Sequence, residues 1–282
     1  MPVVPPHSAQ AARDAVAARL RDLRLDAGMT GRQVAAASGW QPSKVSRLEN
    51  ARTPPTDDDI RAWCRACGAE DQAPDLIAAS RTAESLYVEW RRRQRSGLRQ
   101  LQRSRVPLYE RTQQFRIYCS SVIPGFLQTH EYATALLGSI RRFDETPDDV
   151  AEAVEARITR NQIIRAPGRR FAFVVEEAVL HHVMGGPDVM AGQLGYLLAA
   201  MAFPAVSLGV VPARRTRSMW PQETFTLFDD RQVGVELLTA ALTITAPTEI
   251  AQYEKGFAEL ARMAVYGQHA RTLITGAIDS LG

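Results

Sequence analysis

The stretch from Thr30 to Asn50, TGRQVAAASGWQPSKVSRLEN, constrains the fold most, because it predicts two short helices joined by a sharp turn. Thr30 is suited to cap the first helix, and Gln33 is placed to reach back to the Thr30 backbone in a capping box. Gly39 supplies the turn, since a residue without a Cβ adopts left-handed conformations at little cost. Pro42 is expected to start the second helix, because its fixed φ and missing N–H suit the first helical position.

The second of these helices is predicted to have an apolar and a polar face. Val45 and Leu48 are three residues apart and are expected to face the core, which turns Ser43, Lys44 and Arg47 outward. Arg and Lys donate to guanine O6 and N7, and Ser pairs with several base edges. Such a helix, second in a pair, is typical of a recognition helix in the DNA major groove. The alternative is a basic face that is simply solvated.

Amphipathic helices are predicted on both sides of this pair. Between Ala11 and Met29, the apolar residues Val16, Leu20, Leu23 and Ala27 form the stripe of a helix. Gly28 is expected to end this helix. Thr56 caps the helix after it, whose apolar face consists of Ile60, Trp63, Cys64 and Cys67. The two cysteines form a CxxC pair, but no second pair or histidine lies at zinc-finger spacing, so we interpret them as core residues.

Length and charge favour two domains with different partners. The 282 residues exceed one typical domain, and residues 1–105 hold 18 basic and 12 acidic residues, against 16 and 19 in the remainder. The basic N-terminal part is therefore expected to meet a polyanion. We find no apolar run near the length of a membrane helix and no signal peptide, and three cysteines suggest no disulfide framework. We expect a cytoplasmic protein without a membrane partner.

A resemblance to a known family strengthens the N-terminal prediction. The segment LRDLRLDAGMTGRQVAAASGWQPSKVSRLENARTPP resembles the helix-turn-helix domain of the lambda-repressor-like, or Xre, regulators, over about residues 11–80. The resemblance implies that Arg24 pairs with Glu49. It also implies that the groove-facing positions fall on Pro42, Ser43, Lys44 and Arg47. Gly31 departs from the family, where many members have a glutamine near the phosphates, and Arg32 is a candidate substitute.

The predicted DNA-binding residues share this helix pair and the residues just after it. They are Arg32, Gln33, Gln41, Ser43, Lys44, Ser46, Arg47 and Arg52. Ser43, Lys44 and Arg47 are expected to read bases, whereas Arg32 and Arg52, with Thr30 or Ser46, contact phosphates. Because one recognition helix covers few base pairs, we expect a homodimer that spans two half-sites of double-stranded operator DNA.

The chain after this domain predicts a linker and a second domain. We expect a flexible N-terminus over residues 1–10, the helix-turn-helix domain over 11–83, an arginine-rich linking helix over 84–108 and a sensing and dimerisation domain over 109–282. The alternative for 84–108 is an extension of the phosphate-binding surface.

The second domain is predicted to be a small mixed sheet covered by helices. Its expected elements, in order, are a helix with Tyr109, Phe115 and Tyr118, a helix capped by Thr129, strands in FAFVV and AVSLGVVP joined by helices, a TFTLF–QVGVELL hairpin and a last helix over Glu249–Tyr266. The fold class is therefore α+β, with an all-α five-helix domain followed by a mixed α/β domain.

The second domain also carries a resemblance. The stretches IPGFLQTHEYATALL, FAFVVEEAVLHHVMGGPDVMAGQLGYLLAA and VSLGVVP resemble the uncharacterised C-terminal domain of actinobacterial two-domain Xre regulators, the antitoxin-like and WhiJ-like group, from Tyr109 to Val265. The resemblance implies a domain that receives a signal, from a small co-encoded protein or a small-molecule effector, and it implies no catalytic residues.

The second domain contains two candidate sites, a possible metal or acid-base group and a possible pocket. Glu177 and His181 are four apart and share a helix face, and His182 is adjacent. No third ligand motif accompanies them, so we predict no metal, no cofactor and no enzyme. Glu236 either borders a pocket or lies on an edge strand in water. Trp220 and Phe225 are candidates for the lid of such a pocket. The function alternative to DNA-binding regulation is an antitoxin-like module that sequesters a protein partner.

Overall fold

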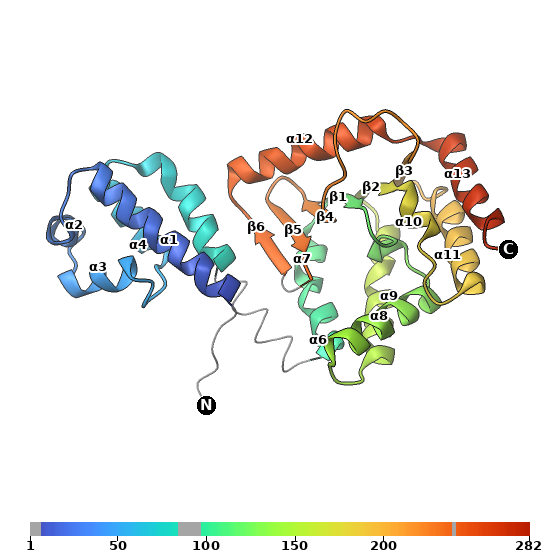
Figure 1. Cartoon of the computed structure of the whole chain (residues 1–282), viewed down its shortest axis with the longest axis horizontal. Helices are drawn as coiled ribbons and strands as arrows, with labels where there is room; N and C mark the ends of the chain where they lie inside the picture. Colours follow the sequence, from blue (N-terminus) through green and yellow to red (C-terminus); the bar gives the residue numbers. More distant parts are fainter. Residues whose placement is uncertain (1–6, 84–96, 239–240) are drawn as a thin grey trace. The chain divides into compact units, whose positions relative to one another are not determined.

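The structure, a computed structural model, describes residues 7–83, 97–238 and 241–282 and divides into two compact units (Figure 1). The first unit comprises Met1–Arg91 with Leu237–Ala251, and the second comprises Arg92–Glu236 with Gln252–Gly282. Among the described residues, no helix is both long and apolar enough to cross a membrane.

The first unit is built mainly of helices. Its elements are α1 (His7–Asp26), α2 (Gly31–Ser38), α3 (Pro42–Glu49), α4 (Asp57–Cys67), η1 (Glu70–Gln72), a helix over residues 73–83, β6 (Ala241–Ile244) and the start of α12 (Pro247–Met263). The predicted pair of short helices is confirmed with its boundaries at Gly31 and Pro42. The prediction that Gly28 ends the first helix is confirmed: α1 stops at Asp26, and Gly28 adopts a left-handed φ of 65°.

The core of the first unit confirms most of the predicted apolar positions. Leu20, Ile60 and Trp63 are completely buried, and the Trp63 indole N–H donates to the Leu20 carbonyl at 3.0 Å. Ala27 lies beyond the end of α1 and is exposed. Cys64 is buried and burial raises the pKa of its thiol to about 11, so this side chain behaves as a small apolar residue.

A segment from late in the chain belongs to the first unit. Residues 237–251, which the sequence assigns to the domain over 109–282, group with the N-terminal helices. The Thr82 hydroxyl donates to the Thr243 carbonyl at 2.9 Å, and the Thr248 hydroxyl donates to Asp75 at 3.1 Å. Because contacts between residues more than 150 positions apart leave no local pattern, the sequence alone does not reveal this grouping.

The second unit contains the sheet. Its helices are α6 (Gly97–Ser104), α7 (Val106–Arg111), η2 (Gly125–Leu127), α8 (His130–Asp144), α9 (Val150–Asn161), η3 (Gln162–Arg165), α10 (Glu177–His181), α11 (Pro187–Ala200), α12 from Gln252 onward and α13 (Gly267–Asp279). Its strands are β1 (Gln114–Cys119), β2 (Arg170–Glu176), β3 (Val206–Val211), β4 (Phe225–Phe228) and β5 (Gln232–Glu236).

Within the second unit, the strand order of the sheet is β3-β2-β1-β4-β5. β1, β2 and β3 are parallel, with Phe115 opposite Phe171 and Phe173 opposite Leu208. β4 runs antiparallel to both β1 and β5. The predicted crossover unit and hairpin are therefore confirmed, and so is the α+β fold class.

Two expectations for the second unit are wrong. Phe115 and Tyr118, expected on a helix, lie on β1, in the middle of the sheet, where the Phe115 and Phe171 rings stack at 4.5 Å. The run QFRIYC is rich in aromatic and β-branched residues, which fit a buried strand better than a helix. The helix expected to be last is followed by α13, which packs Ala270 and Ile274 into the core.

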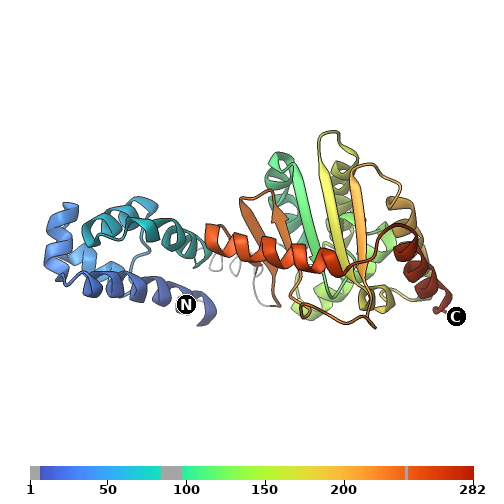
Figure 2. The same ribbon diagram turned by 90° about the horizontal axis from the view of Figure 1, so that it is seen from above.

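Helices cover both faces of the sheet (Figure 2). On one face, α12 packs Phe257 against Phe225 of β4, and its Glu254 carboxylate accepts from Arg116 at 2.7 Å. On the other face, the core joins Phe115 and Phe173 to residues of α8, α11 and α13. The sheet is thus buried on both sides, as expected for its near-continuous apolar strands.

The predicted linking helix is described only in part. Residues 84–96 lie outside the described residues, whereas 97–111 form α6 and α7, which are separated at Arg105. The Asp149 carboxylate accepts from the backbone N–H groups of Leu98 and Arg99, at 3.0 and 2.8 Å. This contact caps α6 and holds it beside α9.

Candidate DNA-binding surface

The α2–α3 pair is fixed by local hydrogen bonds. The Thr30 hydroxyl accepts from the Gln33 N–H, and the Gln33 side chain accepts from the Thr30 N–H at 2.7 Å, so the predicted capping box is confirmed. Gly39 closes α2 with φ 69°. A Cβ on Gly31 would lie 3.3 Å from Val45, which shows how closely α2 approaches α3 at this point.

The C-terminal end of α3 is held by two arginines of α1. Arg24 donates to both carboxylate oxygens of Glu49, at 2.5 and 3.3 Å, and both side chains are less than 15% exposed. The pair implied by the family resemblance is therefore present. Arg21 donates to the Glu49 carbonyl at 2.8 Å, which satisfies an acceptor that a helix end leaves open. The helix is thereby clamped at this end.

Lys44 holds the other end of α3 and differs from its expected position. It was expected to point outward, but its ammonium lies 2.5 Å from Asp59 of α4 and 4.5 Å from the centre of the Trp40 ring. Burial alone would raise the pKa of Asp59, but hydrogen bonds from Lys44 and Thr56 outweigh it and lower that pKa below its ordinary value. In this structure Lys44 therefore stabilises the contact between α3 and α4.

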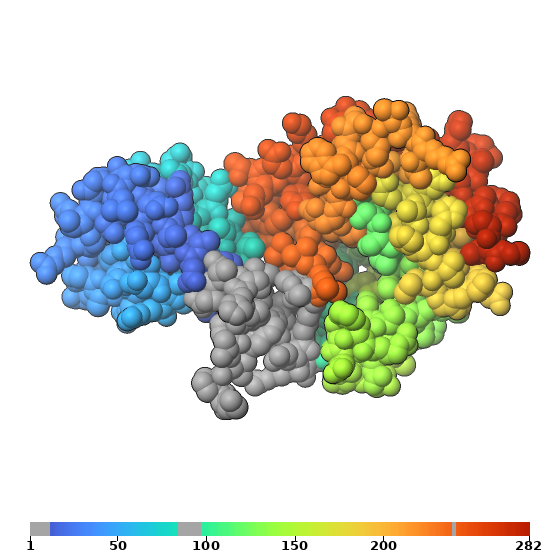
Figure 3. Space-filling view, viewed as in Figure 1, coloured from blue at the N-terminus to red at the C-terminus, as the bar shows by residue number. Residues whose placement is uncertain are grey.

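The other predicted residues form a polar surface on α2, α3 and the loop that follows. Exposed side chains are those of Arg32, Gln33, Gln41, Ser43, Ser46, Arg47 and Arg52. Within the described residues, no carboxylate lies at ion-pair distance from Arg32, Arg47 or Arg52. Figure 3 shows this region, in blue, at the surface of the first unit. Its donors are therefore available to a ligand in solution.

Three contributors to this surface were not predicted. Asp59 and Trp40 position Lys44, and Arg21 supports the end of α3. The signal for Asp59 was present, because Thr56 with an acid three residues later is a capping box, which the structure contains. No local pattern identifies the partners of Trp40 and Arg21, since both contact other helices.

The predicted pocket residues of the second unit lie in three different settings. Trp220 is 71% exposed, Phe225 is buried against Tyr118 and Tyr253, and Glu236 stands at the end of β5 in an ion pair with Arg105. That they line one pocket stays a prediction.

The acid and histidines of α10 make local contacts. Glu177 accepts from the Ala213 N–H at 2.6 Å, and the His182 ring lies 2.9 Å from the Ser121 carbonyl. His181 is exposed. Among the described residues, no group of three or more His, Cys, Asp or Glu side chains is arranged to hold a metal ion.

Comparison with known families identifies both parts of the chain. Residues 15–76 match a family described as a helix-turn-helix domain. Residues 103–276, more than half of the chain, match a family described as a domain of unknown function, DUF5753. No curated protein and no solved structure gives a significant match.

Proposed function

Because this chain belongs to the DUF5753 family and carries a helix-turn-helix domain before the family's domain, we propose that it is a sequence-specific DNA-binding transcription regulator of the lambda-repressor-like type and not an enzyme. One observation carries the proposal. The α2–α3 surface presents exposed donors, among them Arg47, on a helix that Arg24 and Lys44 anchor at its two ends. An anchored helix with free donors suits base readout, since its side chains need little reordering on binding.

The roles of individual residues follow from their exposure. Ser43 and Arg47 read base edges in the major groove, and Arg32 and Arg52 hold phosphates. Gln41 and Ser46 flank them on the same surface. For Lys44 to reach a base, DNA must replace Asp59 as its partner, so its contribution is smaller than that of Arg47.

The active form in this proposal is a homodimer. One recognition helix contacts about three or four base pairs, whereas a two-fold pair reads two half-sites about 34 to 36 Å apart. The DUF5753 domain supplies the dimer contacts and receives a signal from a small protein or a small molecule, which changes the affinity for DNA.

Fluorescence anisotropy tests the proposal on the full chain. Labelled DNA from upstream of its own gene is titrated with protein at two salt concentrations, with unlabelled unrelated DNA as competitor. We expect binding that survives competitor and moderate salt, since specific complexes exceed non-specific ones by about 10³-fold or more. Binding that disappears with the competitor would contradict specific readout and favour the alternative of a module that sequesters a protein.

A further inference from the structure

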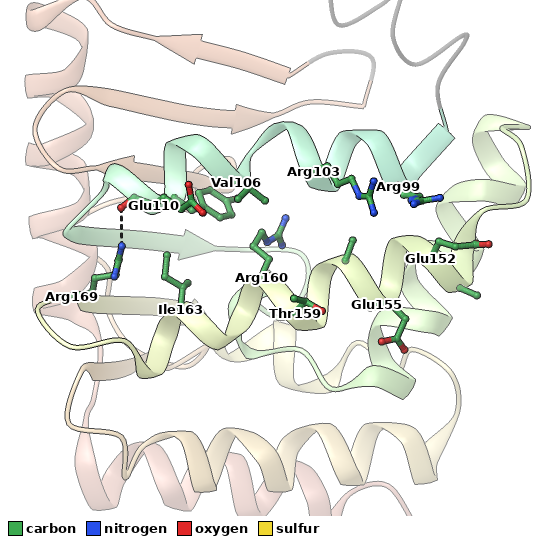
Figure 4. A pocket seen from close by; sticks show the side chains of 13 residues that line it. Arg99, Arg103, Val106, Glu110, Glu152, Glu155, Thr159, Arg160, Ile163 and Arg169 are labelled. Carbon is green, nitrogen blue, oxygen red and sulfur yellow. Dashed lines mark hydrogen bonds between the residues drawn. The ribbon is translucent and has the colours of Figure 1, made fainter.

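The second unit contains a groove between two helical segments. α6 and α7 form one wall, and α9 with η3 forms the other (Figure 4). Its volume is about 780 Å³, within the range of ligand pockets in proteins. The apolar part of its lining comes from Val106, Tyr109, Ala151, Ala156 and Ile163.

The charged lining is unusual because its arginines lack acidic partners. Arg99, Arg103, Arg160 and Arg169 line the groove, and within the described residues no carboxylate lies at ion-pair distance from any of them. Arg160 extends from α9 into the space between the helices, and Arg103 faces it from α6.

Arg160 is the best-placed of these side chains. Its guanidinium lies 5.0 Å from the centre of the Tyr109 ring and donates to the Gln102 side-chain oxygen at 2.8 Å. Its Nε atom is buried and has no hydrogen-bond partner, and the same is true of Nε of Arg169. Two charged groups at this groove therefore retain donors that water does not reach.

A second partly buried arginine adds to the positive charge behind the groove. Arg157 donates to the amide oxygens of Gln128 and Gln102, at 2.6 and 3.3 Å, and these neutral groups cannot balance its charge. Burial, followed by repulsion from Arg160, lowers the pKa of Arg157 to about 10. Buried charge is costly unless it is paired, so an anion in the groove would be stabilised.

The acidic residues of the lining do not cancel this field. Glu110, Glu152 and Glu155 are all exposed, so water screens their charge. Glu236, the other carboxylate that acts on Arg160, is ion-paired with Arg105. Arg160 extends across the groove toward the wall that carries Val106. The groove thus combines an apolar wall with a buried cationic group.

We infer that this groove binds an amphipathic organic anion, whose carboxylate or phosphate pairs with Arg160 and Arg103 and whose apolar body packs on Tyr109, Val106 and Ile163. A planar guanidinium forms two parallel hydrogen bonds with either head group, so both are compatible with the site. Bound in this way, the ligand places a negative charge that opposes the positive charge of Arg160 and of its neighbour Arg157.

Titration calorimetry on the full chain, without DNA, tests the inference. The probes are decanoate and decyl phosphate, each below its micelle concentration, with decylamine as the cationic probe of the same chain length. We expect one anion per chain to bind and decylamine to bind at least about tenfold more weakly. The tighter of the two anions identifies the head group. Absence of binding by both anions, or equal binding of decylamine, would overturn the inference.

Three variants locate the site. Arg160→Gln is expected to weaken anion binding by roughly 10- to 100-fold, because it removes a charge-assisted hydrogen bond. Arg103→Gln, which changes an exposed residue without a structural partner among the described residues, is expected to weaken it several-fold and decides the matter if Arg160→Gln does not fold. The matched control Arg142→Gln, on the exposed face of α8, is expected to bind as the wild type does. Unchanged binding by both groove variants would overturn the assignment.

The role of this ligand as a regulatory signal rests on the proposed function, whereas its binding does not. Because the calorimetry contains no DNA, failure of anion binding contradicts the groove alone. Loss of specific DNA binding in the anisotropy experiment contradicts the regulator alone. A protein that passes both is then titrated with the tighter anion in the presence of DNA, where a change in DNA affinity is expected.

Discussion

The two units of the molecule differ in how their partly buried arginines are paired. In the first unit, Arg24 is less than 15% exposed and meets both oxygens of Glu49. In the second, the charged groups of Arg157 and Arg160 donate to the amide oxygens of Gln102 and Gln128, and among the described residues neither forms an ion pair. The first arrangement pairs its charge directly with an acid, whereas the carboxylate that acts on both arginines of the second, Glu236, is ion-paired with Arg105.

The difference separates charges that hold the fold from charges that are free for a ligand. Arg24 and Lys44 are paired with acids and anchor the recognition helix. Arg47, exposed and without a carboxylate partner among the described residues, remains available to DNA. Arg160 of the second unit also forms no ion pair among the described residues, but it is only partly exposed and lines a groove. An arginine without an ion pair is therefore the proposed DNA contact in the first unit and the proposed anion contact in the second.

The largest expected effect on stability comes from breaking the ion pair between Arg24 and Glu49. Arg24→Met leaves the Glu49 carboxylate buried without its partner and should lower the free energy of unfolding of the first unit by about 3 kcal/mol. Urea unfolding measures it. Arg61→Met is the matched control, since its pair with Asp58 is exposed and should contribute less than about 0.5 kcal/mol. Equal effects in the two variants would contradict a structural role for Arg24.

The next effect concerns the free charge on the recognition helix. Arg47→Ala should weaken binding to the specific site by about 1 to 3 kcal/mol, because one base contact is lost, while leaving stability nearly unchanged. Anisotropy with specific DNA measures the affinity. Arg61→Ala on α4 serves as the control. Unaltered affinity in Arg47→Ala would remove this residue from the DNA contacts.

Replacing Arg157 of the second unit is expected to change the free energy of unfolding in the opposite direction from replacing Arg24. Arg157→Met removes a buried charge without an acidic partner and should raise the free energy of unfolding by about 1 kcal/mol near neutral pH. The folded pKa of about 10 lies below the ordinary 12.5, so the unfolded state binds more protons between these values. The penalty is therefore full below pH 10 and decreases above it.

Urea unfolding of the wild type and Arg157→Met, from pH 7 to pH 11, checks both parts of this prediction. The difference between the two proteins should shrink above about pH 10. A loss of more than about 2 kcal/mol in the variant would show that Arg157 is as well balanced as Arg24.

A smaller loss of stability is expected when Lys44 loses its partner Asp59. Asp59→Asn should cost about 0.5 to 1 kcal/mol at pH 7, because the pair is only partly buried. Since the folded pKa of Asp59 is lowered, its contribution is present above the ordinary value of 3.8 and is lost as pH falls through the folded pKa. Urea unfolding at pH 7 and below pH 3.8 checks this; a difference that persists at the lowest pH would contradict it.

The smallest effect concerns phosphate contacts. Arg52→Ala should weaken binding to specific and unrelated DNA alike and should reduce the slope of log K against log salt by about 1. Anisotropy at several salt concentrations measures this slope. A loss restricted to the specific site would instead place Arg52 among the base-reading residues.

Much of the first unit was predictable because its signals are local. The start of α2 is fixed by Thr30 with Gln33, its end by Gly39, and the start of α3 by Pro42. Each of these signals lies at the helix end that it determines. The pair of Lys44 with Asp59 was missed, since it joins two helices and the lysine fitted an outward face equally well.

The second unit was less predictable because its determinants are distant in sequence. The strand β1 has only six residues and follows closely after helix α7, so its aromatic residues were expected on that helix. The anion groove joins Arg103 to Arg160 across two helices, and its lining shares no motif. Only the packing of α6 and α7 against α9 and η3 brings these side chains together.

Selection of binding sites from random double-stranded DNA tests the central claim most directly, because it needs no knowledge of the operator. The wild type should enrich one motif with two inverted half-sites, about 34 to 36 Å apart. Arg47→Ala should retain the spacing and lose preference at one base pair in each half-site. No enriched motif for the wild type, or an identical motif for Arg47→Ala, would contradict base readout by the free charge of the recognition helix.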